Sequence, residues 1–154
     1  MGRSFHWMNQ KEVISKLHGL TEEGGGLAVI GTEPVKQNSL SEKKNKVVRE
    51  VTKKYLGPRR RAGISFYNPP KDRYEDLLLA SRFKNFQQKS FTIKLKRHVD
   101  EILGHIFSTS YTSKALLGKE SNDFEKEIRK ELLEINPKGI FEEKITFDCY
   151  TVIK

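Results

Sequence analysis

Cysteine, tryptophan and long apolar runs are scarce in this chain of 154 residues, which contains one Cys and one Trp. A lone cysteine cannot form an internal disulfide, so Cys149 is expected to be a buried strand residue and not a reactive thiol. No apolar run approaches the roughly 20 residues that cross a bilayer, and the opening MGRSFHWMNQ lacks the apolar core of a signal peptide. We therefore expect a cytoplasmic protein with no membrane partner.

Metal-ligand motifs are also missing from the sequence. It has no HxxxH or CxxC pattern and no carboxylate cluster of suitable periodicity, so no metal site is expected. The hydrophobic fraction of 36% at this length can support a modest core. Residues 1–154 are accordingly predicted to form a single domain.

Basic residues outnumber acidic ones by 29 to 20, which gives a formal charge of +9. Such a charge attracts nucleic acid or anionic lipid, and its densest run is Arg59 to Arg61. No RNA- or DNA-binding signature accompanies the basic residues, which favours a solvated helix face and a basic loop. The alternative is that the arginine run binds a phosphate or an acidic acceptor.

Capping boxes and periodicity predict the first half of the chain. Asn9 and Glu12 form a capping box, and the apolar spacing that follows predicts a helix up to Leu20. The run LAVIG after three glycines is typical of a strand buried on both faces of a parallel sheet. A second helix is predicted from Ser39 until Gly57 stops it.

In the second half, Phe91, Ile93 and Leu95 alternate with polar residues and predict a strand with one face buried and one wet. The alternation over residues 145–153 predicts a final strand. Helical spacing, with capping boxes at the first and last segments, predicts helices at residues 72–82, 99–106 and 122–135.

The segment GRSFHWMNQKEVISKLHGLTEEGGGLAVIG resembles class I S-adenosylmethionine-dependent methyltransferases that act on small molecules, of the type 11 kind. In that family a loop after the fourth strand leads to a helix, and a glycine-rich turn then enters the fifth strand; these are Ser4 to Met8, Asn9 to Leu20 and Gly24 to Gly31. The family's next helix, sixth strand and antiparallel last strand match Arg73 to Arg82, Phe83 to Lys96 and Phe141 to Ile153. The resemblance covers only the C-terminal half of the family.

The resemblance implies an α/β fold, the C-terminal portion of a Rossmann-like methyltransferase sheet. Helices would flank a buried parallel strand and a closing antiparallel strand pair. Residues 35–72 would form a connector helix and basic loop, and residues 97–139 a helical insertion between the last two strands. The family's D/E-x-G-x-G loop, which brings the cofactor to a helix N-terminus, has no counterpart here. The chain is therefore expected to be truncated, to bind no S-adenosylmethionine alone and to be inactive alone.

By the same resemblance, Phe5, His6 and Trp7 would border the cofactor and the acceptor, at the carboxyl ends of the strands. His6 is the candidate general base if the acceptor must lose a proton; otherwise it only stacks or donates a hydrogen bond. The alternative for the whole aromatic cluster is packing on the core.

The segment STSYTS contains the second set of candidates. Ser108, Ser110 and Tyr111 would line the acceptor channel by family analogy. Hydroxyl runs are also ordinary helix caps and terminators, and this alternative is favoured.

Three functions are compatible with these features. The first is a truncated methyltransferase whose complete form methylates a small molecule. The second is a non-enzymatic module that forms a homodimer or complements a partner chain, because LAVIG would keep one unpaired edge and such edges recruit other chains. The third is a basic nucleic-acid-binding domain, which explains the charge and little else.

Overall fold

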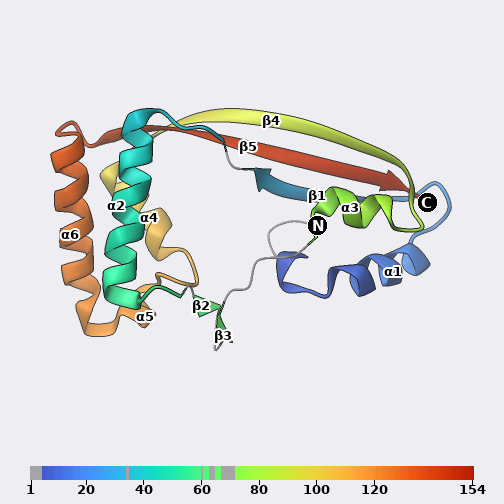
Figure 1. Ribbon diagram of the computed structural model, residues 1–154, viewed down its shortest axis with the longest axis horizontal. Helices are drawn as coiled ribbons and strands as arrows, with labels where there is room; N and C mark the ends of the chain where they lie inside the picture. Colours follow the sequence, from blue (N-terminus) through green and yellow to red (C-terminus); the bar gives the residue numbers. More distant parts are fainter. Residues whose placement is uncertain (1–4, 34, 60, 63–64, 67–71) are drawn as a thin grey trace. The chain divides into compact units, whose positions relative to one another are not determined.

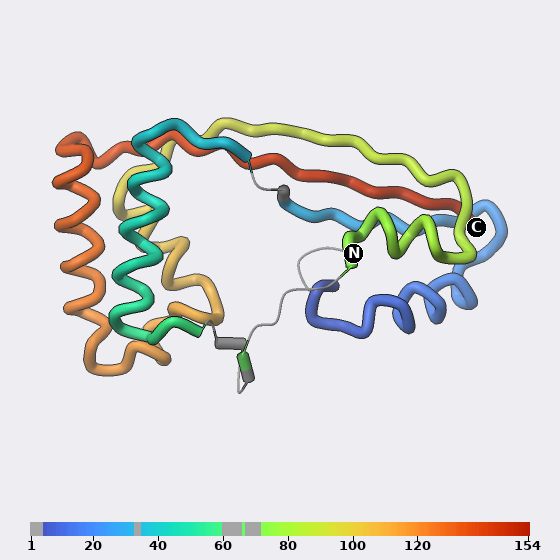
Figure 2. Tube along the Cα trace, in the orientation of Figure 1, coloured from blue at the N-terminus to red at the C-terminus, as the bar shows by residue number. Residues whose placement is uncertain are grey.

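The computed structural model describes residues 5–33, 35–59, 61–62, 65–66 and 72–154. By their contacts, the residues divide into two compact units. Unit 1 comprises Met1–Val35, Pro69–Ile93 and Ile145–Lys154, and unit 2 comprises Lys36–Asn68 and Lys94–Lys144. Both units combine segments that are distant in the sequence (Figures 1 and 2). The single domain expected for residues 1–154 remains a prediction, since grouping by contacts does not show whether either unit folds alone.

The main sheet has three strands in the order β1 (Gly26–Glu33), β5 (Ile140–Ile153) and β4 (Lys84–His98) (Figure 1). β1 pairs antiparallel with β5, and Gly26 lies opposite Ile153. On the other side of β5, the cross-strand contacts of Thr92 with Thr146 and of Ser90 with Asp148 run in the antiparallel register.

The α/β class and the closing antiparallel strand pair are thus confirmed. The parallel pairing predicted for LAVIG is wrong, because the described sheet pairs β1 with β5 alone and in the antiparallel sense. Leu27 and Val29 are buried, whereas Ile30 is exposed. A continuous apolar run reports that both faces are apolar; it does not report the direction of the neighbouring strand.

Of the three glycines at the entry to β1, Gly24 lies in the turn before the strand and Gly26 is the first residue of the strand. Gly24 adopts a φ of 79°, in the left-handed region that glycine tolerates. A Cβ on Gly26 would lie 2.6 Å from the carbonyl oxygen of Val152, so the close approach of β1 to β5 requires glycine there. This run therefore connects a helix to a strand.

One face of the sheet in unit 1 is covered by α1 (Gln10–Leu20) and α3 (Tyr74–Leu79), which lie on the same side in Figure 1. As predicted, Asn9 caps α1, and its side chain accepts a hydrogen bond from the backbone N–H of Glu12 at 3.5 Å. The short 3₁₀ helix η1 (Phe5–Trp7) precedes α1. The buried cluster comprises Phe5, Ile14, Leu27, Val29, Leu77, Leu78, Phe83, Tyr150 and Val152.

The opposite face of this sheet carries large apolar side chains that the described residues leave exposed. Phe91 is 57% exposed and Ile93 is 40% exposed, so the expectation that their side of the strand is buried is wrong. Cys149 on β5 is partly exposed and not buried. The buried side of β5 carries Tyr150 and Val152 instead. We call Ile30, Phe91, Ile93, Phe147, Cys149 and Ile153 the open sheet face.

Unit 2 is built around α2 (Ser39–Leu56), α4 (Val99–Phe107), α5 (Lys114–Leu117) and α6 (Ser121–Ile135). α2 and α6 lie side by side, as Figure 2 shows. The 3₁₀ helix η2 (Gly118–Glu120) precedes α6, and β2 (Arg61–Ala62) pairs antiparallel with β3 (Ser65–Phe66). The buried apolar cluster of this unit comprises Val51, Val99, Ile102, Leu103, Ile106, Leu117, Phe124, Ile128, Leu132 and Phe141.

Helix starts depart from the predicted caps in three places. α2 begins at Ser39 as expected, but Asn38 is its cap and accepts a hydrogen bond from the N–H of Ser41 at 2.7 Å. α3 is preceded by Arg73 without a side-chain cap, since Asp72 lies one residue too early. Asn122 lies inside α6, because η2 leads directly into that helix.

Candidate functional site

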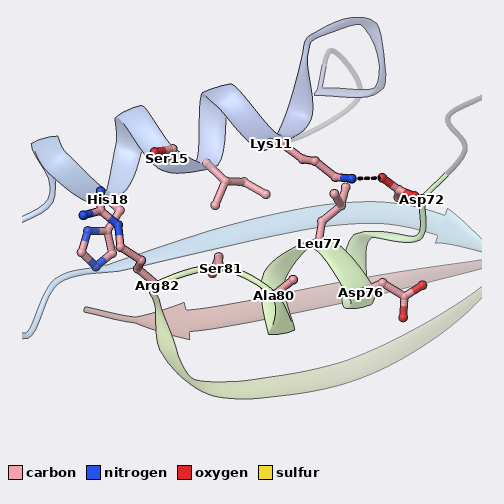
Figure 3. Close-up of a pocket in the computed structure, with 10 residues that line it drawn as sticks. Lys11, Ser15, His18, Asp72, Asp76, Leu77, Ala80, Ser81 and Arg82 are labelled. Carbon is pink, nitrogen blue, oxygen red and sulfur yellow. Dashed lines mark ion pairs between the residues drawn. The ribbon is translucent and has the colours of Figure 1, made fainter.

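A groove of about 460 Å³ lies between α1 and α3 in unit 1 (Figure 3). Ile14 and Leu77 contribute apolar lining. An ion pair between Lys11 and Asp72, 3.0 Å long, lies at one end of the groove, and His18 lies beside Arg82 at the other. The complete lining is Lys11, Ile14, Ser15, His18, Asp72, Asp76, Leu77, Ala80, Ser81 and Arg82.

His18 is the titratable ring of this groove. Loss of hydration lowers the pKa of His18 below 6.5, and the positive charges of Arg82 and Lys154 lower it further. The Phe83 ring packs against the imidazole in a T-shaped arrangement, with 4.9 Å between ring centroids. The groove thus holds a neutral imidazole near neutral pH, while its lysine is already paired. It has no excess charge that would select an ionic ligand.

A second cleft lies in unit 2 along α2, and we call it the α2 cleft. It comprises two adjoining pockets, of about 390 Å³ and about 210 Å³, which we call its lobes because their linings share Asn45, Val48, Thr52 and Tyr111. Along the cleft, α2 presents a stripe of three residues at helical spacing, Asn45, Thr52 and Leu56. This stripe lies about 100° around the helix axis from the stripe that contains the partly buried Val48 and the buried Val51. The larger lobe is further lined by Arg49, Lys53, Leu56, Gly57, Pro58 and Arg59. The smaller lobe is further lined by Lys44, Arg97, Ile102, His105, Ile106, Thr109, Thr112 and Glu143.

A charged triad stands in the wall of the smaller lobe. The ammonium group of Lys44 donates a hydrogen bond to Oε1 of Glu143, and Nε of Arg97 lies 3.6 Å from Oε2 of the same carboxylate. The side chains of Lys44, Glu143 and Arg97 are only 8%, 14% and 21% exposed. Burial of a charge is costly unless it is paired. Two cations share one carboxylate here, so one positive charge is left uncompensated within the triad.

A separate polar cluster fixes α2 against α6. Lys54 and the hydroxyl of Tyr55 donate hydrogen bonds to Glu127, at 2.7 Å and 2.8 Å. These two hydrogen bonds hold the pKa of Glu127 below its usual value, and the bond to Glu127 raises the pKa of Tyr55. This polar cluster and the buried core of unit 2 contact other faces of α2. The stripe of Asn45, Thr52 and Leu56, which lines the α2 cleft, is therefore held in a fixed orientation.

Comparison with known proteins gives a fold and no family. No protein-family model and no curated protein matches the chain. A solved structure described as "a Putative Type II Methyltransferase from Anaeromyxobacter dehalogenans" matches 98% of this chain with a TM-score of 0.52 and 14% sequence identity. The fold is methyltransferase-like. The chain spans only 60% of the length of that structure, and identity at this level carries the fold alone.

Within this methyltransferase-like fold, the three aromatic candidates lie at η1. Phe5 is fully buried and stacks on Tyr74, with 5.5 Å between ring centroids. His6 and Trp7 tilt against each other at 4.8 Å, and Trp7 is half exposed. None of them lines the groove or the α2 cleft. Phe5 packs in the core as the alternative interpretation expected, and the cofactor role of the three residues stays a prediction.

The residues of the segment STSYTS, which follows α4, have different positions in the structure. Ser108 follows the last residue of α4, and its hydroxyl donates to the carbonyl of His105 at 2.7 Å, as a terminating residue does. Ser110 is exposed and does not line either lobe. Tyr111 lines both lobes of the α2 cleft. Of the three acceptor candidates, Tyr111 is thus the one that lines the α2 cleft.

Sequence reasoning missed the triad. Lys44 lies on the same helical stripe as Ser41, Val48 and Val51, and a lysine that interrupts an apolar stripe is a usable signal for a buried charge. Its partner Glu143 lies 99 residues later, on β5, and no spacing rule connects the two. Of the run Arg59 to Arg61, only Arg59 has a described side chain, and it lines the larger lobe.

Two further observations concern ions and membranes. In the described part of the chain, His, Cys, Asp and Glu side chains do not gather in threes as metal ligands would. Among the same residues, no helix combines the length and the apolar character that a membrane span requires.

Proposed function

We propose that residues 1–154 form the distal part of a class I S-adenosylmethionine-dependent methyltransferase that acts on a small molecule. The observation that carries the proposal is the match of nearly the whole chain to 60% of a methyltransferase structure. A second support is the sequence itself, which has no D/E-x-G-x-G motif after a strand. The cofactor is then bound by a stretch of polypeptide other than these residues.

In this proposal the chain positions the acceptor and closes the sheet. Methyl transfer needs an acceptor nucleophile in line with the sulfonium of the cofactor, so catalysis consists mostly of positioning. His6 and Trp7 are the residues proposed to border the cofactor, with His6 as a base only if the acceptor must be deprotonated. Residues 1–154 by themselves are proposed to be inactive and, as expected from their composition, cytoplasmic.

Calorimetric titration with S-adenosylmethionine and with S-adenosylhomocysteine tests the cofactor half of the proposal. Residues 1–154 should show no saturable heat, because their glycine-rich run, Gly24 to Gly26, leads into a strand and does not place its backbone N–H groups at a helix N-terminus. A complete methyltransferase titrated with the same cofactor stock is the control. Micromolar binding to residues 1–154 would overturn the proposal.

The coding sequence upstream of Met1 supplies the complementary test. If it contains an in-frame D/E-x-G-x-G, the longer chain should bind S-adenosylmethionine while residues 1–154 do not. A longer chain that carries the motif and still fails to bind would contradict the assignment of the cofactor site to that segment.

We also propose a partner for the open sheet face, namely the polypeptide that carries the cofactor site. Monomeric proteins rarely leave a contiguous apolar patch of this kind uncovered, and Phe91, Ile93 and Ile30 are large and exposed. The solved methyltransferase has a further stretch of polypeptide that this chain does not span, and such a stretch is a candidate to cover the face. Light scattering of residues 1–154, alone and mixed with the polypeptide that carries the cofactor site, tests it. A stable homodimer of residues 1–154 would assign the face to a second copy, and monomers that form no mixed complex at high concentration would argue against any partner.

A further inference from the structure

The α2 cleft combines a cavity with an excess of positive charge. Its described lining carries one carboxylate, Glu143, against the five cationic side chains Lys44, Arg49, Lys53, Arg59 and Arg97. In the part of the chain that the structure describes, Arg49 and Lys53 form no ion pair with a carboxylate, whereas Lys54 on the same helix pairs with Glu127. Among the described residues, Arg49 and Lys53 thus add two positive charges to the cleft face of α2 that no carboxylate pairs with.

The two lobes differ in chemistry. The smaller lobe holds Lys44 and Arg97, whose N–H groups are hydrogen-bond donors, whereas the hydroxyls of Thr109 and Thr112 in its lining donate to the carbonyl oxygen of Ile106. An ammonium group has three N–H donors and a guanidinium five, and Glu143 engages only part of this capacity. The larger lobe is more apolar, with Val48, Leu56, Pro58 and the ring of Tyr111 in its wall and cations at Arg49, Lys53 and Arg59.

We propose that the α2 cleft binds a small organic anion, with its carboxylate or phosphate group in the smaller lobe and its apolar body in the larger lobe. The anion balances the positive charge that the triad leaves uncompensated, in a site that is drier than the surface. The larger lobe, at about 390 Å³, lies within the roughly 300 to 1,000 Å³ usual for small-molecule pockets.

A nucleic acid fits this geometry less well than a small molecule. The cations at the base of the cleft are mostly buried, so only the end of a compact ligand reaches them. Nucleic-acid surfaces usually spread their cations along a face that the backbone can follow. If the chain acts as proposed above, the anion is the methyl acceptor; that identification rests on the proposed function, whereas binding to the cleft does not.

Matched naphthyl probes test the class of ligand by fluorescence titration without cofactor. The probes are 2-naphthoate, 2-naphthyl phosphate and the neutral 2-naphthalenemethanol, which share an apolar body. At least one of the two anions should bind about tenfold or more tightly than the alcohol, and their order distinguishes carboxylate from phosphate. Equal affinities for all three probes would overturn the proposal.

Charge variants locate the site. The variant Arg97→Gln, which removes the second cation of the triad from the smaller lobe, should weaken binding of the anionic probe by about tenfold. The matched control is Lys43→Gln, which removes the same charge from an exposed position of α2 outside the cleft. This control should change affinity by less than about twofold. An equal loss in both variants would assign the attraction to net charge and contradict the cleft.

A steric variant separates shape from charge. Asn45 is exposed and lines both lobes, so Asn45→Trp fills the cleft at unchanged net charge. Anion binding should be lost while the circular dichroism and the melting temperature stay near those of the parent. Retained binding would overturn the proposal. So would tight binding of an RNA or DNA oligonucleotide that the naphthyl anions cannot displace.

The outcomes for the two proposals remain distinguishable. Anion binding with no cofactor binding by the longer chain would support the cleft and contradict the methyltransferase assignment. Cofactor binding by the longer chain without anion binding would do the reverse.

Discussion

Phe124 and Phe91 both lie in regular secondary structure, but their surroundings predict very different contributions to the free energy of unfolding. Phe124 is fully buried and packs edge-on against Tyr55, with 5.4 Å between ring centroids, whereas Phe91 is on the open sheet face. We expect Phe124→Ala to reduce the free energy of unfolding by about 3–5 kcal/mol, because it leaves a cavity among rigid neighbours. Phe91→Ala should change it by less than about 0.5 kcal/mol. Urea denaturation of both variants checks this, and equal losses would contradict the burial.

His18 should make the protein sensitive to mild acid. Its pKa is lowered in the folded state, so the unfolded chain takes up the proton first as pH falls through about 6.5. Stability then decreases over the window from 6.5 down to the lowered value, and it is recovered as pH rises. His18→Gln should flatten this part of the stability profile measured by thermal denaturation.

The control for that profile is Arg82→Gln. Removal of this cation should move the pKa of His18 only part of the way back toward 6.5, since desolvation is the larger cause. NMR titration of the imidazole protons measures the shift directly. A His18 resonance that titrates at or above 6.5 in the parent protein would contradict the interpretation.

Caps decide where α1 and α2 begin, and the two caps differ in geometry. The side chain of Asn38 accepts from the N–H of Ser41 at 2.7 Å, whereas the corresponding distance from Asn9 to Glu12 is 3.5 Å, at the limit of a hydrogen bond. We expect Asn38→Ala to cost about 1 kcal/mol of unfolding free energy and Asn38→Gly only a few tenths. Asn9→Ala should cost less than Asn38→Ala. Chemical denaturation gives the order, and a reversed order would show that the caps are not the determining contacts.

The positions of helices and strands could be predicted more reliably than the direction of a strand or the burial of its faces. The helix after Asn9, the strand at LAVIG and the helix that ends at Gly57 could all be predicted, because capping and periodicity act within a few residues. The direction of β1 could not, since it depends on β5, more than a hundred residues away. The exposed side of β4 was predicted to be buried, because alternation identifies an apolar face but not what covers it.

The open sheet face gives a prediction for the whole molecule. Cys149 lies on that face and is partly exposed, so a thiol reagent should label it quickly in residues 1–154 under native conditions. A chain that supplies the cofactor half should cover the face and slow the labelling. The control is labelling in denaturant, which should be equally fast for both proteins. Slow native labelling of residues 1–154 would show that the face is already covered.

Unit 2 shows how the tertiary structure joins segments that the sequence presents separately. Residues 35–72 and 97–139 were predicted as a connector and an insertion with different roles. In the structure, α2 from the first and α4, α5 and α6 from the second share one buried core. The α2 cleft follows from this union, because Asn45 and Tyr111 come from different segments. No local sequence pattern predicts that these two segments come together in the fold.

The sequence by itself determined the helices and strands, the excess of basic residues and the absence of a cofactor loop after a strand, because these depend on neighbouring residues or on composition. Only the tertiary structure decided that β1 pairs antiparallel with β5, that one face of the sheet is open and that Lys44, Arg97 and Glu143 meet beside a cleft. Those features arise from contacts across tens of residues, where free energy depends on which surfaces exclude water together and not on local preference.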